Sequence, residues 1–198
     1  MSRVGILGGT FNPPHLGHLR CARQARAELG LDRVLVVVAA VPPHKAVPDD
    51  PGVGDRLAMA RLLAAAEPWM EVSELEVGRP GPSYTITTLR EIHERAPGDD
   101  LTLIVGGDMA AALPTWHEPQ AILGLASLAV AERKGQRRAD VLAALRPLDG
   151  ARRVHFLDMP RLDVSSSQVR RRVAGGERIA DLVPDAVADY IKERRLYA

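Results

Sequence analysis

The chain has 198 residues, of which 46% are hydrophobic and 26% are charged, which suits one domain with a sizeable core. Its formal net charge of +1 excludes a strong overall field toward nucleic acid or a membrane, so local basic groups must hold any anionic ligand. No apolar run could span a bilayer or form a signal peptide, and the single cysteine, Cys21, cannot form an internal disulfide. We therefore expect a cytoplasmic protein in a reducing setting.

Five short apolar runs predict β-strands. They are rich in β-branched residues or leucine and do not alternate strictly with polar residues, as is typical of strands covered on both faces. The runs are Arg3–Leu7, Val34–Ala40, Leu101–Val105, Ser127–Ala131 and Arg153–Leu157. Segments with helical periodicity lie between them, which predicts right-handed βαβ units and an α/β fold with a parallel sheet.

Three stripes of apolar residues at helical spacing predict helices. The stripes are Leu19, Ala22, Ala25 and Leu29, then Met59, Leu62, Leu63 and Ala66, and finally Val183, Val187, Tyr190 and Ile191. We expect Gly30 to end the first helix, and Asp55 and Pro68 to cap and stop the second. The proline-rich connector Ala39–Gly54 is long for a βα loop and predicts a mobile loop on the substrate side, rather than a domain boundary.

The chemically unusual residues follow the predicted strands. The first strand is followed by GGTFNPPHLGH, the second by VPPHK, the third by GGDMAAALPTWHEP and the fourth by ERKG, while the fifth leads several residues later into DVSSSQVRRR. The carboxyl ends of parallel strands meet at one edge of a sheet, and ligands of open α/β sheets bind there. This convergence of glycines, histidines and cations predicts an active site at that edge.

The loop after the first strand combines small residues with two imidazoles. Gly8 and Gly9 carry no side chain, so the backbone there could approach a phosphate or ribose closely. We expect Gly17 and His18 to open the first helix, whose N-terminal N–H groups favour an anion toward which His15 and His18 would point. The alternative is a tight turn with histidines that cap or pack. We favour the functional interpretation because two histidines stand at a helix start after a buried strand.

Three chemistries could use this histidine pair. A metal site would need a further ligand, and only Asp108 is an obvious one, without an HExxH motif or a cysteine cluster to support it. A histidine that activates a serine nucleophile is not supported, because the sequence has no GxSxG elbow and the serines at 165–167 lie far from the histidines along the chain. Electrostatic stabilisation of a phosphoryl group requires no further residue types, because Lys45, Arg133 and Arg170 supply cations beside the histidines. The absence of GxxxxGK[ST] and GxGxxG argues against P-loop and dinucleotide-binding enzymes.

Three further segments have both a functional and a structural interpretation. In VSSSQVRRR, Ser165 or Ser166 could cap a helix with Arg170 one turn in, which makes either a phosphate site or an ordinary N-cap with a solvated basic face. In PTWHEP, Trp116 could stack on a ring or pack half-buried. PGPSYTITTL begins a helix whose N–H groups could bind an anion, although capping by Ser83 also explains it well.

Taken in order, these segments resemble bacterial nicotinate-nucleotide adenylyltransferases of the HxGH nucleotidyltransferase superfamily. The resemblance extends over almost the whole chain, through GGTFNPPHLGHL, PPHK, DRLAMA, PSYTITTL, GGDMAAALPTWH, ERKG, VSSSQVR and VPDAVADYI…LY. It implies a Rossmann-like, doubly wound parallel sheet in a single domain, 1–198, with a C-terminal helical extension, 159–198, that carries SSSxxR. It also implies transfer of AMP from ATP to nicotinate mononucleotide, yielding deamido-NAD and pyrophosphate in NAD biosynthesis, with Mg²⁺ carried by the ATP phosphates.

The resemblance also divides the candidate residues into three groups. Those expected to act on the phosphates in catalysis are His15, His18, Lys45 and Arg170. Those expected to bind ATP are Gly8, Gly9, Thr10, Phe11, Arg133 and Ser166. Those expected to bind the mononucleotide are Thr85, Asp108, Trp116 and His117, with the pyridine ring stacked on Trp116 and the ribose near Asp108.

Some positions depart from the family pattern, and rival functions stay open. Asn12 and Thr87 stand where aspartate is common, and His117 stands where tyrosine is frequent.

Rival acceptors are nicotinamide mononucleotide and phosphopantetheine, although enzymes for the latter are shorter and lack the TWH segment. A nucleotide-binding regulator without turnover is a further alternative, against which the histidine pair and the cations argue. The expected partners are the two small-molecule substrates, without nucleic acid or membrane, and a homo-oligomer stays open.

Overall fold

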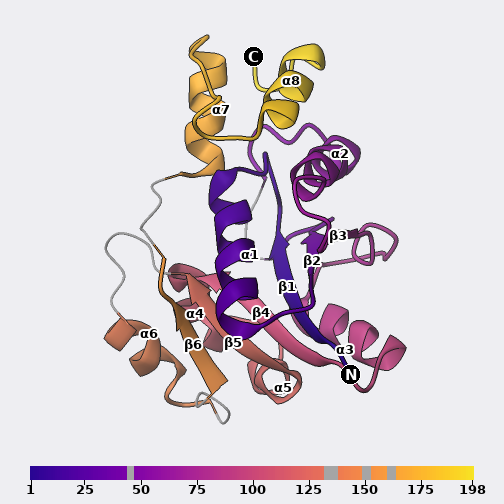
Figure 1. Cartoon of the computed structure of the whole chain (residues 1–198), viewed down its shortest axis with the longest axis vertical. Coiled ribbons are helices and arrows are strands. Elements are labelled where there is room, and N and C mark those ends of the chain that lie inside the picture. The colour runs from indigo at the N-terminus through magenta and orange to yellow at the C-terminus, as the bar shows by residue number, and fades with distance from the viewer. Residues whose placement is uncertain (44–46, 132–137, 149–152, 160–163) are drawn as a thin grey trace.

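The computed structural model describes residues 1–43, 47–131, 138–148, 153–159 and 164–198. Six parallel strands form one sheet in the order β3-β2-β1-β4-β5-β6, with helices on both faces (Figure 1). The strands are β1 (Arg3–Gly9), β2 (Arg33–Val38), β3 (Met70–Ser73), β4 (Asp100–Gly106), β5 (Ala126–Ala131) and β6 (Val154–Leu157). The strand order reverses between β1 and β4, so the predicted Rossmann-like, doubly wound sheet is confirmed.

The helices form two layers and a group beyond the end of β1. The layer on one face consists of α1 (Leu16–Leu29) and α2 (Val53–Ala64). The layer on the other consists of α3 (Thr85–Arg95), α4 (Gly107–Ala112), α5 (Pro119–Leu125) and α6 (Arg138–Leu145), with a 3-10 turn at Leu113–Thr115. Beyond the carboxyl end of β1 lie α7 (Ser166–Ala174) and α8 (Asp185–Glu193) (Figure 1). Among the described residues, no helix has both the length and the apolar character needed to cross a membrane.

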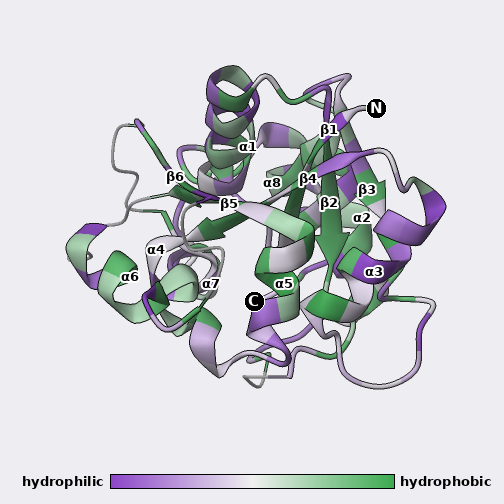
Figure 2. Cartoon of the chain, turned by 90° about the horizontal axis from the view of Figure 1, so that it is seen from below, coloured by the Kyte–Doolittle hydropathy of each residue, from purple (hydrophilic) through white to green (hydrophobic). Residues whose placement is uncertain are grey.

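Each face of the sheet has its own apolar core. Val34, Val36 and Val38 of β2 are buried toward α1 and α2, whereas Val37 joins the core under α3 and α5. This division follows from the alternation of side chains along a strand. Each fully buried Val, Leu or Ile side chain contributes about 1.5–3 kcal/mol. The hydrophobic strands therefore lie between helices whose outer faces are more hydrophilic (Figure 2), which explains the continuous apolar runs in the sequence.

The five predicted strands are confirmed, with ends that differ by one or two residues. The sequence interpretation missed β3, which has four residues and pairs only with β2 at the edge of the sheet. Only Met70 of this strand is buried, so it has no apolar run that periodicity could reveal.

The helix ends agree with prediction in one case and differ in another. Gly30 ends α1 with a φ of 60°, a left-handed conformation that glycine adopts without strain. Asp55 was wrongly predicted to cap α2, because Gly52 is the N-cap and Asp55 lies inside the first turn. Its carboxylate instead accepts a hydrogen bond from the hydroxyl of Tyr190, in α8, at 2.8 Å. The helix ends at Ala64, so Pro68 does not stop it directly.

Candidate active site

A cavity of about 550 Å³ opens at the carboxyl ends of β1 and β4. Its size is within the range of sites that bind small molecules. The predicted site residues that line it are Gly8, Gly9, Thr10, Phe11, His15, His18, Asp108, Trp116, Ser166 and Arg170. Segments far apart in the sequence thus meet where the strand order reverses. The roles of the individual residues stay predictions.

The two histidines stand at the start of α1. His15 is the N-cap residue and is buried, and its ring stacks on that of His18 with 3.7 Å between centroids. The backbone N–H of His15 donates to Nδ1 of His18 at 3.1 Å, so the capping and packing considered from the sequence are also present. A ring nitrogen that accepts carries no proton, so the proton of the neutral His18 ring lies on Nε2. This tautomer can donate to an anion in the cavity.

The two glycines Gly17 and Gly8 leave space of different kinds beside these histidines. A Cβ at Gly17 would lie 2.8 Å from the ring of His15, which is closer than real Cβ contacts come. Only glycine therefore leaves room for the stacked ring. A Cβ at Gly8 would meet no atom within 4 Å, and this residue lines the cavity, so the missing side chain leaves space in which a ligand could approach the backbone.

Arg170 is held by two segments that are distant in the sequence. Its Nη1 donates to the carbonyl of Asn12 at 2.7 Å, and its Nε pairs with Oδ2 of Asp49 at 3.2 Å. Its Nη2 also donates to the hydroxyl of Ser167 in the same helix, at 3.5 Å. The guanidinium therefore has two neutral partners and one anionic partner. A charged donor with fixed geometry suits a phosphate oxygen, which would compete with Asp49 for it.

The serines at the start of α7 tie this helix to the loop after β1. Ser165 is the N-cap, and its hydroxyl accepts from the N–H of Gln168, as the sequence suggested. The hydroxyl of Ser166 donates to the carbonyl of Pro13 at 2.8 Å. The hydroxyl proton of Ser166 is thus used within the protein. The donors that this turn could offer to an anion are then its backbone N–H groups and Arg170.

A second cavity, of about 70 Å³, shares Trp116 with the first. Thr85 and His117 line this smaller cavity, together with Tyr84. The rings of Tyr84 and His117 pack with 4.4 Å between centroids. Three of the residues predicted to bind the mononucleotide thus gather around a space that suits a small ring. Tyr84 was not singled out from the sequence, although it stands in the SYT segment that carries the resemblance.

Ser83 does not cap α3, contrary to the structural interpretation of its segment. Tyr84 is the N-cap residue, without a side-chain cap. The hydroxyl of Ser83 accepts from the backbone N–H groups of Ala40 and Val41, at 3.0 and 3.2 Å. These N–H groups follow β2, where the hydrogen-bond ladder ends, and they need another acceptor. Ser83 therefore connects the start of α3 to the connector after β2.

The remaining predicted site residues are the cations Lys45 and Arg133 and the possible metal ligand Asp108. Lys45 and Arg133 lie outside the described residues. Asp108 is exposed, in the first turn of α4. Within the described ranges, no three His, Cys, Asp or Glu side chains gather in a way that could hold a metal ion. Asp108 lines the same cavity as groups that could donate hydrogen bonds to a phosphate. This arrangement fits Mg²⁺ that arrives with a nucleotide, because Mg²⁺ is commonly bound by one or two carboxylates together with substrate phosphates.

The sequence is similar to known proteins along almost its whole length. The cytidylyltransferase-like family matches residues 6–172. A probable nicotinate-nucleotide adenylyltransferase of Citrifermentans bemidjiense is 44% identical over 212 residues, with 98% of each chain covered. Another, of Roseiflexus sp. strain RS-1, is 45% identical and covers 98% of this chain and 97% of its own. The chain belongs to the nicotinate-nucleotide adenylyltransferase family.

Solved structures of similar proteins share the fold of this adenylyltransferase-family chain. The Plasmodium falciparum nicotinic acid mononucleotide adenylyltransferase complexed with NaAD matches 100% of this chain with a TM-score of 0.82 and 18% identity, and 98% of that chain is covered. The same enzyme complexed with APC matches with a TM-score of 0.81 and 17% identity, with the same coverage. The expected fold class of the family is therefore confirmed.

Arg56 organises the site of this adenylyltransferase-family chain and was missed from the sequence. It lies in α2, only 1% exposed, and pairs with Asp50 at 2.9 Å. Its guanidinium also donates to the carbonyls of Thr10, Ala39 and Ala40. A buried guanidinium is tolerated when its donors are satisfied in this way. Arg56 therefore joins the loop after β1 to the connector after β2. The only sequence signal was an arginine within the DRLAMA helix start.

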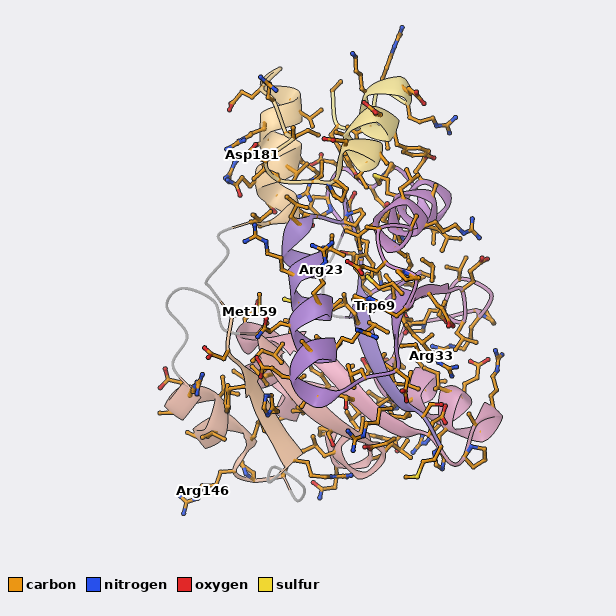
Figure 3. All side chains as sticks on the ribbon, viewed as in Figure 1. Arg23, Arg33, Trp69, Arg146, Met159 and Asp181 are labelled. Carbon is orange, nitrogen blue, oxygen red and sulfur yellow. The ribbon has the colours of Figure 1, made fainter. Side chains whose placement is uncertain are left out.

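Further side chains line the larger cavity without having been assigned to it from the sequence. Among them are Asn12, Cys21, Val105, Met109, Met159 and Ser167. Met159 follows the end of β6, on the side toward α1 in Figure 3. Most of these residues belong to no motif with its own chemistry. Their position at or after the carboxyl end of a strand, or on α1, was the available signal, because every such segment reaches the same edge of the sheet.

Proposed function

We propose that this protein transfers the adenylyl group of ATP to nicotinate mononucleotide, which yields deamido-NAD and pyrophosphate in NAD biosynthesis. The junction of the two cavities supports this most directly. His15, His18 and Arg170 line the larger cavity, and Thr85 lines the smaller one, with Trp116 between them. Groups that could donate hydrogen bonds to phosphates thus lie next to a space that suits a small ring, as a reaction between two nucleotides requires. The relatives that are 44% and 45% identical are both named probable nicotinate-nucleotide adenylyltransferase.

The nucleophile of this reaction is the 5′-phosphate of the mononucleotide. One of its oxygens attacks the α-phosphorus of ATP in line, and the bond from that phosphorus to the bridging oxygen of pyrophosphate breaks, with the electron pair leaving on pyrophosphate. The second pKa of such a phosphate is about 6, so it is ionised near neutral pH and needs no protein base. Catalysis then consists of positioning and charge stabilisation.

The residues around the larger cavity supply that stabilisation. His18 donates from Nε2, and Arg170 donates from its guanidinium, to phosphate oxygens of ATP. His15 lines the same cavity and orients His18, because the two rings stack and its N–H binds Nδ1 of His18. The first turn of α7 adds backbone N–H donors. On the acceptor side, Trp116 offers a flat face on which a pyridine ring stacks.

We further propose that Mg²⁺ enters with ATP, bound by its phosphates, with Asp108 as a carboxylate of this chain that could contact it or its waters. Bound in this way, Mg²⁺ would neutralise phosphate charge. A cytoplasmic location and a homo-oligomer also stay predictions.

Pyrophosphate release tests the proposed function. The protein is incubated with ATP and Mg²⁺ and with one acceptor at a time: nicotinate mononucleotide, nicotinamide mononucleotide or phosphopantetheine. We expect the fastest release with nicotinate mononucleotide, and loss of release when a chelator removes Mg²⁺. Faster release with either other acceptor would change the substrate assignment. ATP binding without release for any acceptor would instead indicate a nucleotide-binding regulator.

A further inference from the structure

Asn12 connects three distant segments of the chain beside the larger cavity. Its Oδ1 accepts a hydrogen bond from the hydroxyl of Tyr197 at 2.7 Å, and its Nδ2 donates to the carbonyl of Pro48 at 2.8 Å. Its backbone carbonyl accepts from Nη1 of Arg170 at 2.7 Å. Asn12 is 2% exposed, so water cannot easily replace a lost partner. The position of Arg170 therefore depends on how well Asn12 is held.

Tyr197 is the donor that holds the carboxamide of Asn12. Burial raises the pKa of the Tyr197 hydroxyl above its usual range, against the lowering influence of Arg170, so the group keeps the proton that it donates. Tyr197 follows α8, and its ring packs against the core shared by α1 and α2. The C-terminal segment thus reaches the loop that leads from β1 to His15 and the start of α1.

Arg170 has a second anchor that competes with substrate. Asp49 pairs with it at 3.2 Å, and this carboxylate is 68% exposed on the connector after β2. The carbonyl of Asn12 is neutral, so a guanidinium held there keeps its charge available to a phosphate. If Asn12 shifts, Arg170 loses its short contact with a neutral carbonyl and keeps a 3.5 Å contact with Ser167 and the ion pair with Asp49, whose charge offsets the charge that a phosphate would meet.

We propose that Tyr197 is a positioning residue for the phosphate end of the cavity, acting through Asn12 on Arg170. The inference rests on the proposed function for the role of Arg170 toward ATP phosphates. It assigns Tyr197 an effect on ATP, rather than on the acceptor, since the smaller cavity contains none of these residues.

The test compares Tyr197→Phe with Tyr190→Phe. The control also removes one tyrosine hydroxyl near the C-terminus, but that hydroxyl donates to Asp55 in α2, which does not line the cavity. We expect Tyr197→Phe to raise the Kd and the KM for ATP about five- to thirtyfold, because a buried acceptor loses its partner. The KM for the acceptor should stay unchanged, and Tyr190→Phe should leave both within about twofold. Equal effects of the two variants on ATP affinity would overturn the inference.

Two further measurements separate positioning from general stability. In an Arg170→Ala background, Tyr197→Phe should cause no additional loss of ATP affinity, since residues that act in one chain of contacts are not additive. Fully additive losses would contradict the proposed path. Amide hydrogen exchange of residues 8–15 should be faster in Tyr197→Phe than in wild type or Tyr190→Phe. This measurement needs neither turnover nor ATP, so it decides on Tyr197 even if the proposed function fails, and unchanged exchange overturns the inference.

Discussion

The proposed phosphate end and the proposed acceptor end of the site are built in different ways. At the phosphate end, Ser166 and Arg170 bind the carbonyls of Pro13 and Asn12, which are 153 and 158 residues away in the sequence. The proposed acceptor end uses the start of α3, where Ser83 accepts from two backbone N–H groups, and the segment after the 3-10 turn, where the ring of His117 packs on Tyr84. Stabilising a developing charge requires donors that do not move, and anchoring to backbone carbonyls provides this. Binding a ring requires a flat apolar face, which aromatic packing provides.

This difference predicts a division of kinetic effects. Substitutions at the phosphate end should lower the rate or ATP affinity, whereas substitutions at the acceptor end should mainly raise the KM for the mononucleotide. The following variants test the division, beginning with the largest expected effect.

Replacing His18 by alanine should lower kcat by about 10²–10³, or more, because it removes a donor aimed at developing charge. The variant also removes the acceptor for the N–H of His15, so a loss of about 0.5–2 kcal/mol in unfolding free energy is expected, as for a lost helix cap. Steady-state pyrophosphate release and thermal melting measure the two effects. Near wild-type turnover would refute the role of His18.

Replacing Arg170 by alanine should raise the KM for ATP about ten- to a hundredfold, as expected for a charge-assisted hydrogen bond. Arg171→Ala is the matched control, since Arg171 is the next residue of the same helix and is exposed. It should change the KM for ATP by no more than about twofold. Similar values for both variants would mean that general positive charge, rather than the anchored guanidinium, attracts ATP.

Trp116→Ala should raise the KM for the mononucleotide about tenfold, because stacking on an aromatic ring contributes about 1–3 kcal/mol per base. Trp116 lines both cavities, so the KM for ATP shows whether its effect is confined to the acceptor. Trp116→Phe keeps an aromatic face and should recover part of the affinity. An unchanged KM for the mononucleotide in Trp116→Ala would argue against stacking.

His117→Ala should have the smallest effect, about threefold or less on the KM for the mononucleotide. The side chain of His117 is 52% exposed and packs on Tyr84, so its loss should disturb the protein little. The substitution also keeps the backbone N–H, which could still contact the mononucleotide. The same initial-rate measurements apply. A loss as large as that of Trp116→Ala would show that the imidazole itself contacts the pyridine carboxylate.

Much of the architecture and the convergence of the site could be predicted from the sequence. Buried parallel strands have continuous apolar runs, and this signal located every strand among the described residues except β3, whose single buried residue carries no pattern. The strands in turn predicted the edge at which His15, His18 and Arg170 meet. Cap assignments were less successful, because Ser83 and Asp55 bind groups from other elements rather than their own helices.

The sequence by itself determined the succession of strands and helices and the edge at which the chemically unusual residues gather, because periodicity and turn residues reflect interactions between near neighbours in the chain. Only the tertiary structure decided that Arg56 is buried among carbonyls, that Tyr197 reaches Asn12, and that the two cavities share Trp116. A hydrogen bond requires its two atoms to lie about 3 Å apart, and which distant groups come that close depends on how the whole chain packs.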